Sequence, residues 1–264
     1  GGGALSNLTI KTKGNVTLGA AVSNFDRVTI DPVTTTLADV TANIAINISN
    51  VVGNNTPGNT DSVTLNGVLT TTATNQTNAI NIVTGQFINN AEANALVVGA
   101  GSNWLVWSND PNADTVGGLI PDFIQYNAQY ISATPAQSNN GLLYSFAPMM
   151  TTGNLSILGP ITKTYDGTTS ATLTAANYAF NGVPGDTVTF SAPLSGNYDN
   201  KNASVGVTKT VTVNLPTSTP LNATANNGAT TVYGYSFTAS PGGTTLSADN
   251  VGQIDPALLE VTAT

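Results

Sequence analysis

The chain has 264 residues, of which 40% are hydrophobic and only 8% are charged, and its formal net charge is −8. It contains no His and no Cys, which removes the usual proton shuttle at neutral pH, thiol nucleophiles, disulfides and the common zinc ligands, so we expect no metal and no cofactor. The six basic residues are too few for a nucleic-acid partner or an anionic membrane surface, and no apolar run approaches the roughly 20 residues needed for membrane insertion.

Residues 1–100 are predicted to form the coils of a right-handed parallel β-helix. Short runs that alternate apolar and polar residues recur about every 17 to 20 residues, and this period predicts a solenoid with one coil per run. Asn-, Gly- and Thr-rich stretches between the runs are typical of corners. An antiparallel sandwich is the alternative, but direct hairpin dipeptides are scarce. The runs are Leu8–Ile10, Val28–Ile30, Ile46–Ile48, Val63–Leu65 and Ile80–Ile82.

Residues 101–150 are predicted to form an aromatic-rich capping segment and a linker. Trp104–Ser108 has the pattern of a strand, with Trp104 and Val106 on one face and Leu105 and Trp107 on the other. The terminal coil of a solenoid needs a cover for its core, and large aromatic side chains suit that role. The same aromatic residues are the candidates for a platform that binds sugar rings, with core packing as the alternative. These ligand-binding candidates are Trp104, Trp107, Tyr126 and Tyr130.

Residues 151–264 are predicted to form a small β-rich module. Asp166-Gly167 and Gly185-Asp186 lie between Thr- and Val-rich runs, as in antiparallel hairpins. In Tyr165-Asp166-Gly167 we expect Gly to take a positive φ, Asp to cap its own loop and Tyr to pack inward.

The motifs of this region resemble a known repeat, the YDG module of large bacterial exoproteins related to filamentous hemagglutinin. Five motifs occur in the order found in that module. They are Lys163–Thr169, Gly185–Val188, Tyr198–Gly206, Tyr233–Tyr235 and Val261–Thr264.

A second segment resembles the part that closes the hemagglutinin-type β-helix before such repeats. It comprises Trp104–Ser108, Asp110-Pro111, Thr115 with Gly117–Leu119, and Tyr126-Asn127 with Tyr130. Asn103 stands where Arg is common and Trp107 where Tyr is common.

The resemblance implies a secreted bacterial adhesin. Members of this family are exported by two-partner secretion through an outer-membrane partner, and their long β-helical stalks carry small β modules that act in attachment and biofilm formation. The partners implied are a host or neighbouring cell surface or an extracellular polysaccharide. The module itself is expected to be β-grasp-like or immunoglobulin-like. The chain begins Gly1-Gly2-Gly3 with no initiator Met, so we expect it to be part of something longer.

Two further patterns are typical of a binding or modification site but also have an explanation without such a site. Asp110, Asn112 and Asp114 have the spacing of the first half of a calcium loop, but Thr115 and Pro121 replace the Gly and Glu that such a loop requires, which favours a turn held by side-chain-to-backbone bonds. N-x-S/T triplets that could be glycosylated occur readily by chance in a chain this rich in Asn and Thr.

The sequence favours a non-catalytic adhesin segment, for which we name no catalytic residue. Two alternative functions stay open. A purely structural spacer that presents a distal binding domain is the first. A β-helical polysaccharide-degrading enzyme is the second, and it requires converging carboxylates, or a base beside bound calcium. The only acids in the first hundred residues are Asp26, Asp31, Asp39, Asp61 and Glu92.

Overall fold

A computed structural model describes residues 6–49, 59–149, 153–190, 194–215, 223–235 and 245–258. The described residues form an all-β protein whose only helical element is a 3₁₀ turn, η1 (Ala175–Asn177). The chain divides into two compact units. Unit 1 comprises Gly1–Pro148 and Asn227–Gly234, and unit 2 comprises Met149–Asn226 and Tyr235–Thr264.

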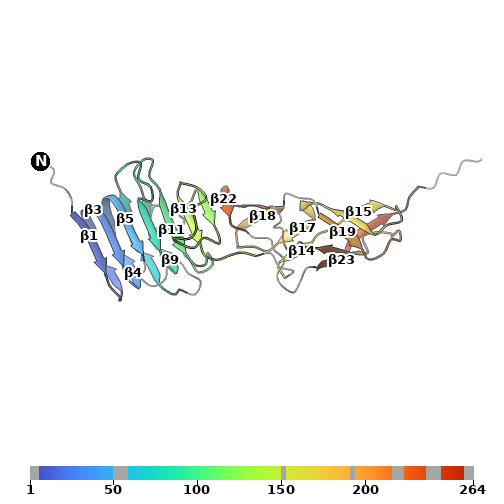
Figure 1. The fold of residues 1–264 in the computed structure, drawn as a ribbon, viewed down its shortest axis with the longest axis horizontal. Coiled ribbons are helices and arrows are strands. Elements are labelled where there is room, and N and C mark those ends of the chain that lie inside the picture. Colours follow the sequence, from blue (N-terminus) through green and yellow to red (C-terminus); the bar gives the residue numbers. More distant parts are fainter. Residues whose placement is uncertain are drawn as a thin grey trace, which may run out of the picture. The chain divides into compact units, whose positions relative to one another are not determined.

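Unit 1 contains short strands that occupy successive levels of two sheets (Figure 1). Its strands are β1 (Ser6–Lys11), β2 (Val16–Leu18), β3 (Val22–Asp31), β4 (Thr34–Leu37), β5 (Val40–Ser49), β6 (Ser62–Leu65), β7 (Leu69–Thr71), β8 (Ile80–Val83), β9 (Gln86–Asn89), β10 (Leu96–Val97), β11 (Trp104–Ser108), β12 (Phe123–Gln125), β13 (Gly141–Tyr144) and β22 (Thr230–Tyr233).

The large sheet of unit 1 has the order β1-β3-β5-β8-β11-β13-β12-β22, with β7 paired to both β5 and β10. Its pairs are parallel and mostly in register, so side chains of one kind stack along the sheet, and every position of the main ladder from Ile30 onward is buried. Each buried aliphatic side chain stabilises the fold by about 1.5–3 kcal/mol. That ladder consists of Ile10, Ile30, Ile48, Ile82, Val106, Leu142, Ile124 and Val232.

The small sheet of unit 1 has the order β2-β4-β6-β9 and is also parallel. Leu18, Leu37 and Leu65 stack in one ladder that ends at Asn89. Asn89 is buried but its polar atoms are paired: its side-chain nitrogen donates to the carbonyls of Glu92 and Val116, and its oxygen accepts from the amide of Ala91.

The prediction of one coil for each apolar run is wrong for Val63–Leu65. That run pairs with Thr35–Leu37 and Phe87–Asn89 in the small sheet, whereas Ile46 pairs directly with Ile80 in the large sheet. The other runs stack in the large sheet as expected. The error arises because alternation identifies a strand but does not say which of two stacked sheets receives it.

The segment predicted as a cap continues the large sheet. Strand β13 pairs with β11 on one side and β12 on the other, although β12 precedes it in the chain. The prediction placed all of 151–264 in one module, whereas Thr230–Tyr233 belongs to unit 1 and pairs with β12.

Unit 2 is built on a five-stranded sheet of order β15-β23-β20-β19-β16, with a two-stranded sheet β14-β17 and the neighbouring strands β18 and β21. Only β15–β23 is parallel in the five-stranded sheet. The strands are β14 (Leu155–Ile157), β15 (Ile161–Thr164), β16 (Ser170–Leu173), β17 (Tyr178–Phe180), β18 (Asp186–Phe190), β19 (Leu194–Tyr198), β20 (Lys209–Asn214), β21 (Ala223–Asn227) and β23 (Thr245–Asp255).

The two predicted hairpin turns of unit 2 do not join paired strands. The segment 165–169 connects β15 and β16, the two edge strands of the five-stranded sheet, which pair with β23 and β19 respectively. Gly185-Asp186 stands where β18 begins; β18 neighbours β21, whereas the preceding strand β17 pairs with β14. The two edge strands β15 and β16 nevertheless contact each other, so the sheet curls until its edges approach. The motif predicted at Val261–Thr264 lies outside the described residues.

Candidate functional site

Three of the four aromatic residues predicted as ligand-binding candidates are buried. Trp104 and Trp107 are each 3% exposed and Tyr126 is 2% exposed, whereas Tyr130 is half-buried. Trp104 takes the interior ladder position beside Ile80. A sugar could not reach these three side chains without a rearrangement of the protein. They pack in the core, which was the alternative to a sugar-binding platform.

The residues around Tyr130 cover the outer face of the large sheet. Leu105, Trp107, Phe123 and neighbouring side chains form an apolar cluster there, and the Tyr130 ring packs edge-on against Trp107 with centroids 5.3 Å apart. The Asn81 oxygen accepts from the indole Nε1 of Trp107 at 3.2 Å, and its nitrogen donates to the Tyr130 hydroxyl at 3.4 Å. Tyr130 is therefore held in a defined position with one side toward solvent.

Beside Tyr130 the large sheet is hollowed into a pocket of about 260 Å³, called here the polar pocket. The floor comes from the outer face of β3, β5 and β8, where Arg27 pairs with Ala45 and Asn47 pairs with Asn81. The small side chain of Ala45 leaves room between larger polar neighbours. The polar pocket is lined by Arg27, Ile44, Ala45, Asn47, Gln76, Thr77, Asn78, Asn81 and Tyr130.

The chemistry of the polar pocket is that of amides, hydroxyls and one guanidinium. None of its described lining residues carries a carboxyl group. The part of the chain that the structure describes contains one ion pair, Lys163–Asp166, and shows no hydrogen bond from the Arg27 side chain. Such a surface can bind a polar ligand, but it has no group to act as an acid or a base.

Sequence reasoning found Tyr130 but missed the rest of the polar pocket. Arg27 and Asn47 look like ordinary outward positions of two strands, and only the register of β3 against β5 places them on one surface. The available signal was the alternation itself, which puts Arg27, Asn47 and Asn81 on the polar face of their strands.

The acids of the segment that resembles the first half of a calcium loop are engaged by protein donors. The Asp110 carboxylate accepts from the backbone nitrogen of Asn112 at 2.9 Å, which is the expected turn. Asp114 accepts from the amide of Phe87 at 2.8 Å and from the Ser108 hydroxyl at 2.5 Å. Burial raises the pKa of Asp114 to about 7, against the lowering effect of these hydrogen bonds and with a small raising effect from Asp110. Among the described residues no three acids gather to hold a metal.

Two acids of the first hundred residues also accept hydrogen bonds from protein donors. Asp26 accepts from Asn43, and Asp39 accepts from the amide of Val68 at 2.8 Å. Asp61 is buried, and burial raises its pKa. Asp26 and Asp39 are therefore engaged by protein donors, as Asp110 and Asp114 are.

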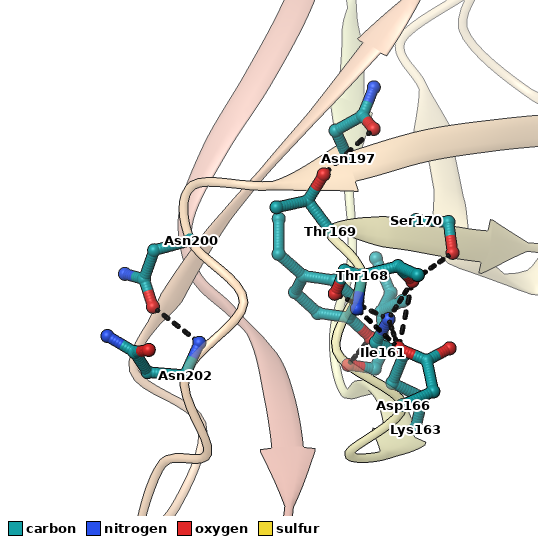
Figure 2. A network of polar contacts seen from close by, with 10 residues as sticks. Ile161, Lys163, Asp166, Thr168, Thr169, Ser170, Asn197, Asn200 and Asn202 are labelled. Atoms are coloured by element: carbon teal, nitrogen blue, oxygen red, sulfur yellow. Dashed lines mark hydrogen bonds and ion pairs between the residues drawn. The ribbon is translucent and has the colours of Figure 1, made fainter.

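In unit 2 the Tyr165-Asp166-Gly167 turn is the centre of a polar network (Figure 2). Gly167 has φ +77°, as expected, and Asp166 accepts from the backbone nitrogen of Thr168 at 2.9 Å. The Lys163 ammonium donates to Asp166 at 2.7 Å and to the carbonyl of Thr168 at 2.8 Å. These bonds, the Lys163 bond first, lower the pKa of Asp166 to about 2.

The expectation that Tyr165 packs inward is wrong. Tyr165 is 41% exposed, and the buried tyrosine near this turn is Tyr198, which is 3% exposed and donates to the carbonyl of Ile161 at 3.0 Å. Lys163 lies over the Tyr198 ring, 5.6 Å from its centroid. The Tyr165 backbone amide pairs with Asp255, which continues the β15–β23 ladder and leaves its side chain on the outer face.

Comparison with known proteins identifies one domain. Residues 151–227 match the YDG domain family, and this range nearly coincides with the first segment of unit 2. Unit 2 therefore contains a YDG domain, and the motif at Tyr233–Tyr235 lies beyond the matched range. No curated protein and no solved structure matches the chain. No described helix has the length and apolar character of a membrane span.

Proposed function

We propose that this chain is a non-catalytic segment of a large secreted bacterial surface adhesin that supports attachment, aggregation or biofilm formation through contact with polysaccharide. The observation that carries the proposal is the YDG domain at residues 151–227 next in sequence to a unit of stacked parallel strands. Export by two-partner secretion and display at the cell surface follow from the resemblance to hemagglutinin-type exoproteins.

Within this proposal, unit 1 is the C-terminal part of a right-handed parallel β-helix. Parallel pairing through two sheets supports it, since from β1 to β9 each passage of the chain adds a strand to both sheets. Right-handed crossover between parallel strands is the strong general preference. The β-grasp-like and immunoglobulin-like descriptions of the YDG module both stay predictions.

Such a segment acts through its length, which carries a binding surface away from the cell, and through many weak contacts along that length. Stacked coils bury an aliphatic core on the inside and present amides and hydroxyls outside, which exchange hydrogen bonds with sugar hydroxyls without a large desolvation cost. Weak contacts repeated along a long molecule add through effective concentration. The polar pocket supplies one such contact surface, with Tyr130 at its edge.

The structural spacer is the second candidate, and the burial of Trp104, Trp107 and Tyr126 favours it, because three of the four predicted sugar-binding aromatics serve the core. A polysaccharide-degrading enzyme is the weakest candidate, since the polar pocket is lined by no carboxyl group among the described residues.

A binding assay with the whole chain tests the proposal. The purified protein is applied to a glycan array and to bacterial and epithelial cell surfaces, with heat-unfolded protein as the control. We expect saturable binding of the folded chain at micromolar concentration to at least one polysaccharide or cell type. Absence of binding to every surface would leave the spacer and contradict the proposal.

A further inference from the structure

We infer that the polar pocket is a subsite for an acidic sugar, a pyranose that carries a carboxylate. The inference rests on the proposed contact with polysaccharide and adds to it a place and a ligand chemistry. The pocket brings together one guanidinium, a set of neutral amides and one aromatic ring from the levels of β3, β5 and β8 and from the loop after β12.

Arg27 determines the charge of the ligand. It lines the pocket, and the described residues include no carboxylate partner for it, in a protein whose formal net charge is −8. A guanidinium matches a carboxylate with two parallel N–H···O bonds. Because the pocket holds a single cation, it compensates one negative charge, which fits a carboxylate better than a divalent phosphate.

The amides determine that the rest of the ligand is polar. Asn47, Gln76 and Asn78 line the pocket together with Asn81, and a side-chain amide carries donor and acceptor atoms, as sugar hydroxyls do. The Asn78 oxygen already accepts from Asn103 and the Gln76 nitrogen donates to the carbonyl of Thr74, so the other amide atoms of these two residues are the ones available to a ligand. Asn81 is fixed by Trp107 and Tyr130, so this part of the pocket is preorganised. Preorganised donors lower the ordering cost of binding.

The volume of the pocket matches one sugar unit of a longer chain. Its volume of about 260 Å³ lies just below the range of roughly 300–1,000 Å³ that drug-sized ligands occupy. Tyr130 closes one side and can present its ring to the apolar face of a pyranose. The pocket opens on the outer face of the sheet, so the neighbouring units of a polysaccharide can continue into solvent.

Calorimetric titration of the whole chain with matched ligands tests the inference. The probes are trigalacturonate, a hyaluronan tetrasaccharide and sialyllactose, each compared with its carboxyl methyl ester, which keeps the ring and removes the charge. We expect at least one acid to bind and its ester to bind at least about 10-fold more weakly, since the ester loses the charge-assisted contact with the guanidinium.

Variants locate the binding. Arg27→Gln should weaken binding of the acid at least about 10-fold and Arg27→Lys by less, because Lys keeps the charge but not the fork geometry. The matched control is Lys13→Gln, which removes a cation from an exposed turn outside the pocket and should leave binding unchanged. Asn47→Ala provides a second variant without a change of charge and should also weaken binding; circular dichroism and tryptophan emission check that each variant is folded.

The outcomes separate this inference from the proposed function. Equal binding of acid and ester, or full binding by both Arg27→Gln and Asn47→Ala, overturns the acidic-sugar subsite. If the chain then still binds a neutral polysaccharide or a cell surface, the proposed function stands without it. If no glycan and no surface binds, both fail.

Discussion

At the scale of single residues, Asn and Asp side chains accept hydrogen bonds from backbone amides that a neighbouring strand would pair in a continuous ladder. Asn103 accepts from the amide of Asn78, Asn140 accepts from the amide of Trp104, and Asp114 accepts from the amide of Phe87. Each satisfies a backbone group that a short strand leaves unpaired, and a buried unpaired group costs about 1–3 kcal/mol. The many Asn side chains of the chain therefore pair backbone groups near strands as well as keeping the surface polar.

Asp114 should make the stability of unit 1 depend on pH. Its pKa in the folded protein is about 7, against 3.8 as the ordinary value, so folding takes up a proton between about pH 4 and pH 7. The stabilisation that the protonated Asp114 carboxyl gives to the folded state is fully present below pH 3.8 and is lost as the pH rises through 7.

We therefore expect the free energy of unfolding of unit 1 to fall by about 2–4 kcal/mol between pH 5 and pH 8. Urea titrations followed by tryptophan emission measure this for unit 1 alone, because both tryptophans lie there. Asp114→Asn should flatten the dependence while Asp31→Asn, a matched loss of charge, should keep it. An equally steep profile in Asp114→Asn would contradict the assignment.

Tyr198 should stabilise unit 2 through its hydroxyl. Tyr198→Phe removes the 3.0 Å bond to the carbonyl of Ile161 and leaves that acceptor buried, so we expect a loss of about 1–2 kcal/mol. Tyr165→Phe is the control, since Tyr165 is exposed, and should change the unfolding free energy by less than about 0.5 kcal/mol. Thermal unfolding followed by the tyrosine circular dichroism signal gives both values. Equal losses in the two variants would refute the role of Tyr198.

At the scale of elements, the last strand of the large sheet depends on a glycine. Gly234 has φ +86°, and a Cβ added there would lie 2.1 Å from the carbonyl oxygen of Tyr126. The Tyr126 amide donates to the carbonyl of Tyr233 at 2.9 Å, and the Thr230 hydroxyl donates to the carbonyl of Pro121 at 3.1 Å. The strand β22 is therefore held close to the segment that follows β12.

Gly234→Ala should release β22 from β12, because backbone atoms cannot move away from the added methyl group. Gly228→Ala is the matched control: Gly228 also has positive φ, +58°, but no atom lies within 4 Å of an added Cβ, so it should cost only about 1 kcal/mol of strain. Hydrogen exchange of the Tyr126 amide should accelerate at least about 10-fold in Gly234→Ala and little in Gly228→Ala. Unchanged exchange in Gly234→Ala would show that this contact does not hold the strand.

At the scale of the whole molecule, the sequence predicts the all-β class of structure better than it predicts which strands pair with one another. Alternation identified the strands at Leu8–Ile10, Val28–Ile30 and Ile46–Ile48, since a buried face and a polar face are a local property. It could not place Val63–Leu65 in the small sheet or insert β13 between β11 and β12, because those pairings depend on distant partners. Arg27 in the polar pocket was missed for the same reason.

The chain is proposed to bind polysaccharide without cleaving it, and the mass of an immobilised polysaccharide layer reports binding and cleavage together. A quartz crystal microbalance carrying pectin, hyaluronan or a bacterial exopolysaccharide is exposed to the whole chain at micromolar concentration for several hours and then rinsed. We predict a reversible gain of mass on at least one layer and a return to the starting value. A final mass below the starting value would show cleavage, and no gain on any layer would show a spacer, and either result would contradict the account.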